Sequence, residues 1–269
     1  MTLDRKELKR QAKDAMRAAR PSPYWVTMLL LVITLLLNVL GMSLNGTLEA
    51  YRVMLASALE GQMVYVEPRS TGGMIGWLLQ MALEVMGIEM TVGFILYSLR
   101  IWRREKAGFG DLFDGFGVFF RSIWIQLLPA LLVSLWSLIY MVPVTTMIVQ
   151  TGNAMWLLIG LPLLIPALMA SYSYRLAVYI MLDDPAMGCF QCVAMSREIM
   201  RGHRWELFKL DLSFVGWSLL CALVPVAGLL LAVWLAAYMQ VTFAGYYVTA
   251  ARRFMACNAP PVESQTPMQ

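Results

Sequence analysis

Three charged residues lie inside long apolar runs of the sequence: Glu89, Arg175 and Asp211. An unpaired charge in hydrocarbon costs at least about 2.5–3.5 kcal/mol, so such residues pair with one another or line a polar cavity. Counted at about 1.5 Å per helical residue, Glu89 lies about 16 Å deep, Arg175 about 12 Å and Asp211 about 6 Å. We therefore expect Arg175 to pair with Asp211 first and Glu89 second, as a charge pair that fixes helix packing. The alternative function is a polar cavity for an ion, a proton or a lipid headgroup.

A second charged group consists of Arg197, Arg201 and Arg204, at spacings of four and three. The spacing predicts one face of a helix that begins at residues 183–185 (DDP), a carboxylate cap followed by proline, and ends at Gly202. The other side is mostly apolar: Cys189, Val193, Ile199 and Met200. Such a helix lies in the headgroup plane, with its arginines on anionic headgroups and its apolar side on acyl chains. The alternative is a solvated basic face on a helix packed against protein.

Known catalytic and metal-binding motifs are absent from the sequence. There is no H-E-x-x-H, G-x-S-x-G or Walker A pattern, and the only histidine, His203, fits a surface position beside a helix end. Asp183 and Asp184 have no third carboxylate at helical spacing, so capping explains them better than magnesium. The pair Cys189 and Cys192 lacks the second pair that a zinc ribbon needs. We expect no enzymatic activity, metal or cofactor; an intramembrane enzyme would have to work with carboxylates and tyrosines alone.

The composition is that of a membrane protein. Of 269 residues, 59% are hydrophobic and only 14% are charged, whereas soluble domains carry about 25% charged residues. The apolar residues form runs of about 20, long enough to cross a bilayer as helices. The predicted fold is therefore all-α, a polytopic membrane protein of about six transmembrane helices with amphipathic cytoplasmic surface helices.

The expected organisation has three parts. Residues 1–23 form a basic amphipathic surface helix, residues 24–253 a six-helix transmembrane domain, and residues 254–269 a disordered tail. The six predicted spans are 24–44, 76–99, 118–142, 155–182, 207–224 and 229–249. Pro162 and Pro166 predict a kink or a broken first turn in the fourth span. A short amphipathic helix is expected in the loop at residues 47–61.

The distribution of Lys and Arg predicts the orientation. Eighteen of the 21 basic residues fall in four segments that the six spans place on one side. The positive-inside rule makes that side cytoplasmic, with both termini there. Seven of the 18 belong to the first surface helix, whose apolar stripe is Leu8, Ala12, Ala15, Met16 and Ala19. A stripe of this kind beside a span favours anionic membrane lipid as partner over nucleic acid.

Several segments resemble one family across nearly the whole chain. They are residues 5–9 (RKELK), 111–116 (DLFDGF), 171–174 (SYSY), 179–185 (YIMLDDP) and, most specific, 207–217 (LFKLDLSFVGW). They resemble the bacterial integral membrane family called domain of unknown function 975, which is similar to membrane domains beside glycerophosphodiester phosphodiesterases. The resemblance implies a multi-pass protein of the bacterial cytoplasmic membrane and no established activity. The chain departs from the family pattern after Pro143 and at Ala167, where glycine normally follows the proline.

Together these patterns predict an integral membrane protein without enzymatic activity that binds lipid or an unidentified partner protein. The second possibility is a transporter or lipid-moving protein with a polar intramembrane site, which needs a continuous polar path. Only four residues within the spans hint at such a path: Glu84, Glu89, Arg175 and Gln240.

Overall fold

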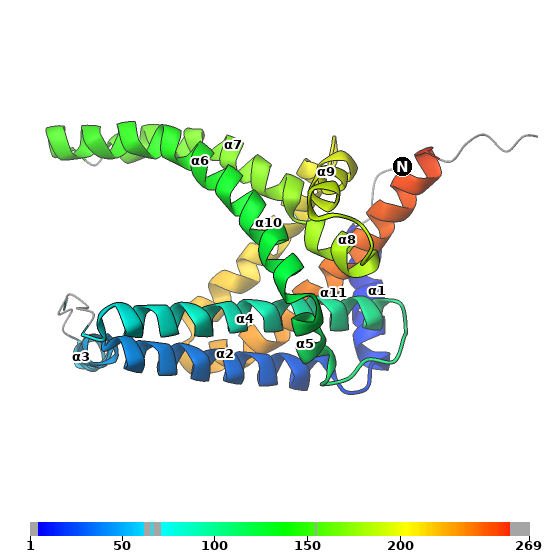
Figure 1. Ribbon diagram of the computed structural model, residues 1–269, viewed down its shortest axis with the longest axis horizontal. Helices are drawn as coiled ribbons and strands as arrows, with labels where there is room; N and C mark the ends of the chain where they lie inside the picture. The colour runs from blue at the N-terminus through cyan, green and yellow to red at the C-terminus, as the bar shows by residue number, and fades with distance from the viewer. Residues whose placement is uncertain (1–4, 62–65, 67–70, 154, 259–269) are drawn as a thin grey trace, which may run out of the picture. The chain divides into compact units, whose positions relative to one another are not determined.

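The computed structural model describes residues 5–61, 66, 71–153 and 155–258 (Figure 1). Every regular element within these ranges is a helix, so the predicted all-α fold is confirmed. The elements in chain order are α1 (Arg5–Ala18), α2 (Pro23–Asn45), α3 (Leu48–Leu59), α4 (Gly73–Trp102), α5 (Asp111–Asp114), η1 (Gly115–Val118), α6 (Phe119–Thr151), α7 (Trp156–Tyr174), α8 (Ala177–Asp183), α9 (Cys189–Ile199), α10 (Arg204–Leu223) and α11 (Pro225–Asn258).

Several of the helices are long and apolar enough to cross a membrane. Within the described residues there are five such stretches: Pro23–Asn45, Gly73–Trp102, Asp111–Thr151, Ile165–Asp183 and Leu230–Cys257. Large apolar side chains stay exposed on them, including Leu35 and Ile139. An exposed apolar surface that extends along several helices suits contact with lipid better than contact with water. The protein is therefore a membrane protein.

The fifth predicted span, 207–224, coincides in position with α10. This helix has 20 residues, but its first turns carry Arg204, Glu206, Lys209 and Asp211. At least three of these charges fall in any 18 consecutive residues of the helix, and this number of charges accounts for its absence from the five stretches. Six spans with both termini in the cytoplasm stay a prediction.

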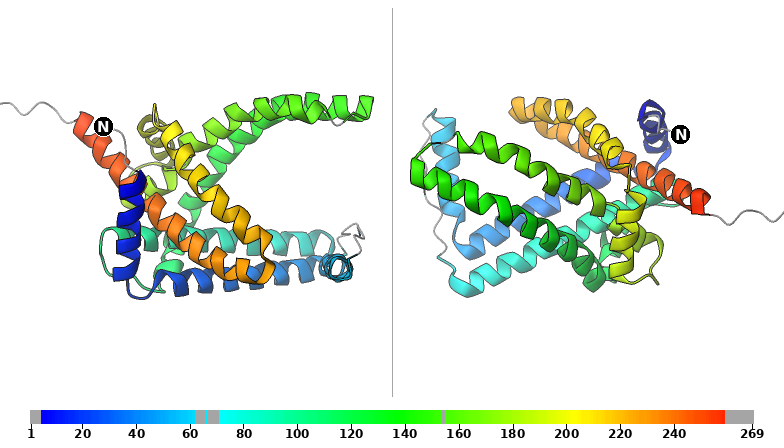
Figure 2. Two further views of the ribbon diagram at one scale, coloured as in Figure 1. Left: turned by 180° about the vertical axis from the view of Figure 1, so that it is seen from behind. Right: turned by 90° about the horizontal axis from the view of Figure 1, so that it is seen from above.

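The described helices form two units, of which one comprises Lys13–Ser122 and Trp217–Gln240. We call it the hairpin unit, because α2 and α4 run antiparallel beside each other, joined through α3 (Figures 1 and 2). Asn45 Nδ2 donates to Gln80 Oε1 at 2.8 Å near one end of the pair. The Tyr97 hydroxyl donates to the Pro21 carbonyl at 2.8 Å near the other. The two bonds hold the register of the pair.

A glycine contact brings the α5–η1 turn onto α4. A Cβ placed on Gly93 would fall against the carbonyls of Asp111 and Leu112, so only glycine allows this approach. Arg100 on α4 forms ion pairs with Asp111 and with Asp114. The turn thus covers the end of α4 that the sequence places at the cytoplasmic side.

The other unit comprises Met1–Ala12, Ile123–Gly216 and Val241–Gln269, and we call it the pocket unit. The rings of Tyr179 and Tyr247 stack with centroids 5.4 Å apart, and the Tyr247 hydroxyl donates to Asp183 at 2.8 Å. Ser196 on α9 donates to the Ser173 carbonyl at 2.8 Å. These contacts gather α7, α8, α9 and the end of α11 into one core.

Helix α7 continues through Pro162 and Pro166 without a break, because an apolar helix tolerates the loss of single backbone bonds, and it ends at Tyr174. A kink at these prolines stays a prediction. The predicted start of the next helix is wrong. No helix begins at residues 183–185: α8 ends at Asp183, and α9 begins at Cys189, after Gly188. Asp184 instead accepts a bond from the Ala186 amide at 3.0 Å in the intervening turn.

The predicted disordered tail, 254–269, is also wrong in its first residues. Helix α11 extends to Asn258, because the apolar and alanine-containing segment after Arg253 continues the helical pattern. The remainder, 259–269, lies outside the described residues. The short helix expected at 47–61 is present as α3.

Candidate functional site

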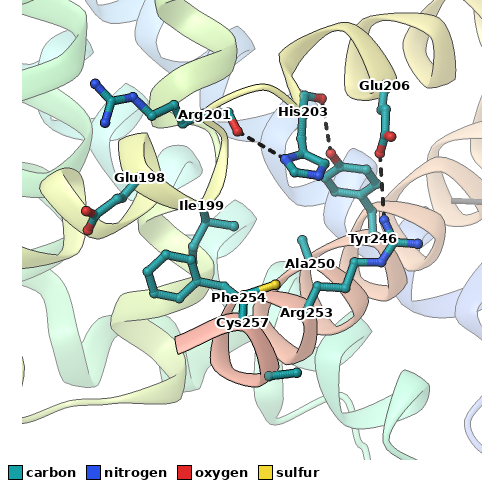
Figure 3. Close-up of a pocket in the computed structure, with 11 residues that line it drawn as sticks. Glu198, Ile199, Arg201, His203, Glu206, Tyr246, Ala250, Arg253, Phe254 and Cys257 are labelled. Atoms are coloured by element: carbon teal, nitrogen blue, oxygen red, sulfur yellow. Dashed lines mark hydrogen bonds and ion pairs between the residues drawn. The ribbon is translucent and has the colours of Figure 1, made fainter. Parts of the chain in front are cut away.

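The candidate site is a pocket of about 530 Å³ in the pocket unit, which we call the α11 pocket (Figure 3). The connection from α9 to α10 forms one wall, and the last turns of α11 form the other. Its lining residues are Glu198, Ile199, Arg201, His203, Glu206, Tyr246, Ala250, Arg253, Phe254, Ala256 and Cys257.

The α9–α10 connection is a tight turn built around Gly202. Helix α9 ends at Ile199, and Gly202 takes a φ of +82°, a conformation that glycine adopts without strain. The His203 amide then donates to the Met200 carbonyl at 3.1 Å, and α10 begins at Arg204. This turn places Arg201 and His203 in the lining of the pocket.

Polar contacts tie α11 to this turn. The Tyr246 hydroxyl, on a side chain that is 1% exposed, donates to the His203 carbonyl at 3.4 Å. Arg253 and Glu206 face each other at 3.8 Å, while Glu206 Oε2 has no hydrogen-bond partner. Figure 3 shows both contacts on the same side of the pocket. The oxygen that faces Arg253 is this same Oε2 atom, and it is buried, so the ion pair ties α10 to α11.

The pocket is amphipathic. Its charged side chains come from the turn and from Arg253, whereas Ile199, Ala250 and Phe254 supply an apolar surface. Two arginines and two glutamates line it, so their charges balance. A ligand that fits this lining carries both a polar head and an apolar part.

A neighbouring pocket of about 400 Å³ contains the predicted lipid-contacting residues, and we call it the three-arginine pocket. Arg197, Arg201 and Arg204 line it together with Ala194 and Glu198. The prediction that one helix face carries the three arginines is wrong. Arg197 belongs to α9, Arg201 to the turn, and Arg204 is the first residue of α10. The turn at Gly202 brings them together, although they come from three elements.

The apolar side of α9 is covered by protein. Cys192, Val193 and Ile199 are buried, and α9 packs against α7 and α8. The sequence led us to expect that these residues face acyl chains. They face protein instead, because the packing of α7 and α8 covers the same surface. The packing against protein agrees with one part of the alternative from the sequence, whereas contact of the basic face with solvent or with lipid stays a prediction. The stripe on α1 is buried as well, at Leu8, Ala12, Ala15 and Met16.

Arg175 forms an ion pair with Asp211, the first of the two partners expected from the sequence. Its guanidinium carbon lies 4.1 Å from the ring centroid of Phe243. Glu89 belongs to the hairpin unit, where it is fully buried and accepts a hydrogen bond from Ser122. The structure thus joins Arg175 to Asp211 and gives Glu89 a neutral partner.

The sequence analysis missed Glu206, Tyr246 and Arg253 as pocket residues. Glu206 and Arg253 are ordinary charges at the ends of predicted spans, and Tyr246 is one of several tyrosines in an apolar helix. Their separation of some 40 residues along the chain left no local spacing to detect. Neither Cys189 nor Cys192 is part of a metal-binding cluster in the described part of the chain.

Comparison with curated proteins and with solved structures finds no match. The model of one protein family matches residues 1–253, nearly the whole chain, and its description reads protein of unknown function (DUF975). This is the family that the sequence segments resemble, and the match spans every helix of both units except the last turn of α11. The chain is therefore a member of the DUF975 family of proteins of unknown function.

Proposed function

We propose that the protein is a membrane module without enzymatic activity that binds the anionic headgroup of a membrane lipid in the three-arginine pocket. The observation that carries the proposal is the convergence of Arg197, Arg201 and Arg204 on one cavity of about 400 Å³. Only one carboxylate, Glu198, lines the cavity with them, so its lining carries net positive charge. Guanidinium groups bind phosphate oxygens through paired N–H donors, which suits a phospholipid headgroup.

The position of the pocket supports a lipid rather than a soluble anion. Helix α10 begins at the pocket with Arg204 and continues into an apolar segment toward Leu223. With the orientation predicted from Lys and Arg, the pocket faces the cytoplasmic leaflet, where each basic residue adds about 1 kcal/mol of attraction to anionic lipid.

The test replaces Arg197, Arg201 and Arg204 together with Gln. Lipid retained by the purified protein is measured by native mass spectrometry after washing at low and at high salt. We expect the triple variant to retain at least about tenfold less anionic lipid at low salt, and its residual binding to depend less on salt.

The matched control removes three other charges from the same predicted side, through Arg103→Gln, Arg104→Gln and Lys106→Gln. Its lipid retention stays close to that of the unmodified protein if the pocket binds the headgroup. An equal loss in both triple variants would show general surface attraction, and no loss in either would refute lipid binding at the arginines.

A lipid-moving protein is the second candidate, and one observation favours it. Residues of α6 and α7 line an open cavity together with Arg175, which lies within a predicted span. The test measures how fast a fluorescent phospholipid moves between the leaflets of vesicles that contain the protein. If the protein is only a binding module, we expect no change in this rate, whereas a lipid-moving protein should increase it.

A further inference from the structure

The cavity between α6 and α7 is a second candidate binding site, separate from the three-arginine pocket. It measures about 470 Å³, within the range of about 300–1,000 Å³ typical of ligand pockets. The two helices lie side by side in Figures 1 and 2. The cavity is lined by the first half of α6, the last turns of α7, Arg175 and Val178. None of its lining residues lines the α11 pocket or the three-arginine pocket.

Polar groups in this cavity have unused hydrogen-bonding capacity. The side-chain nitrogen of Gln126 is buried and has no hydrogen-bond partner. Pro129 has no N–H, so the Ile125 carbonyl lacks its usual helical donor four residues on. Buried polar groups are normally satisfied, and an unpartnered donor in a cavity indicates a group that completes it.

Arg175 supplies positive charge to the same cavity. A guanidinium has five N–H donors, and the pair with Asp211 involves the Nη1 atom. Phe243 lies against one face of the guanidinium, 4.1 Å from the guanidinium carbon. The side chain is nevertheless 35% exposed, so other N–H donors remain for a ligand in the cavity.

The remainder of the lining is apolar. Ile125, Ala130, Val133, Leu168 and Val178 contribute to it. Arg175 lies about 12 Å inside the predicted span, where a small hydrated anion would lose its water. An anion joined to an alkyl chain enters more easily, because the chain gains the apolar surroundings.

We propose that this cavity binds the oxyanionic head of a single-chain amphiphile. Arg175 and Gln126 donate hydrogen bonds to the head, and the apolar lining holds the first part of the chain. Asp211 holds the guanidinium through its Nη1 atom, and its negative charge competes with the anionic head for Arg175. The site is independent of the proposed headgroup site.

The test titrates dodecyl phosphate onto the purified full-length protein in dodecyl maltoside and measures binding by native mass spectrometry. The titration uses the background with Arg197, Arg201 and Arg204 replaced by Gln, so that the three-arginine pocket does not contribute. Inorganic phosphate is a parallel probe that carries the oxyanion without a chain. We expect dodecyl phosphate to bind with one-to-one stoichiometry and inorganic phosphate to bind at least tenfold more weakly.

Two variants separate binding from stability. Gln126→Leu leaves the ion pair intact, and we expect about threefold to tenfold weaker binding from the loss of one hydrogen bond. Asp211→Asn removes the competing carboxylate, and we expect several-fold tighter binding. A purely structural role for Arg175 predicts no such tightening.

The proposal is overturned if Gln126→Leu and Asp211→Asn bind dodecyl phosphate as their parent does. Equal binding of inorganic phosphate would refute the amphiphile as ligand. If the unmodified protein binds dodecyl phosphate but the triple arginine variant does not, the probe binds in the three-arginine pocket, and this result would also overturn the proposed site. Failure of the headgroup proposal leaves these comparisons unchanged, because they share no residue with it.

Discussion

The Tyr246 hydroxyl on α11 donates a hydrogen bond to the backbone carbonyl of His203 at 3.4 Å. His203 directly precedes Arg204, and Arg201 lies two residues before it, so this bond holds the turn that gathers the arginines. The same turn forms a wall of the α11 pocket. One side chain of a long helix thus shapes both pockets of the candidate site.

Replacing Tyr246 with Phe tests that relationship. The ring stays packed, while the hydrogen bond is lost, so we expect the free energy of unfolding to fall by about 0.5–1.5 kcal/mol. We also expect lipid retention to decrease, because the turn loses a restraint. Thermal unfolding in detergent and native mass spectrometry measure the two effects. The control is Tyr51→Phe on α3, where the tyrosine is exposed and both quantities stay unchanged.

Arg175 and Asp211 should act as one unit in stability. Each single replacement by Ala lowers thermal stability, and the double replacement adds little, with a coupling energy of about 0.5–3 kcal/mol. A double-mutant cycle in detergent measures it. The exposed pair Arg52 and Glu49 on α3 is the control, with an expected coupling of about 0.2–1 kcal/mol. Strictly additive losses for Arg175 and Asp211 would contradict the observed pair.

Gly93 should tolerate no side chain. In Gly93→Ala the new methyl group meets the carbonyls of Asp111 and Leu112, so the α5–η1 turn must move away from α4. We expect a loss of about 1–3 kcal/mol in stability, measured by thermal unfolding. Gly216→Ala is the matched control on α10, where no atom lies within 4 Å of the new methyl group. There we expect a neutral or slightly stabilising effect, since alanine favours helix over glycine. Equal effects at both positions would contradict the close approach.

The orientation in the membrane is tested by reporter fusions. A reporter that is active only in the cytoplasm should be inactive when fused after Asn45 and active when fused after Gly108. The physical reason is the concentration of Lys and Arg around residues 100–121. The reverse pattern of activity would invert the proposed topology.

The apolar runs by themselves determined that the chain is a set of long helices. Helix α2 covers Pro23–Asn45 where the sequence predicts residues 24–44, because a helix in an apolar solvent satisfies its backbone bonds locally. The pairing of Arg175 with Asp211 was also predictable. The depth of a charged residue in a predicted span follows from counting residues along the helix. Because few charged residues lie within the spans, Arg175 has few possible partners.

Tertiary structure alone decided how the turn between α9 and α10 forms a site. The local pattern of arginines predicts one helix face, but the reversal at Gly202 distributes them over α9, the turn and α10. Glu206 meets Arg253, and Tyr246 meets His203, across some 40 residues of chain. Such contacts depend on how whole helices pack against one another. No spacing within a single helix encodes them, since each partner alone is an ordinary residue at the end of an apolar run.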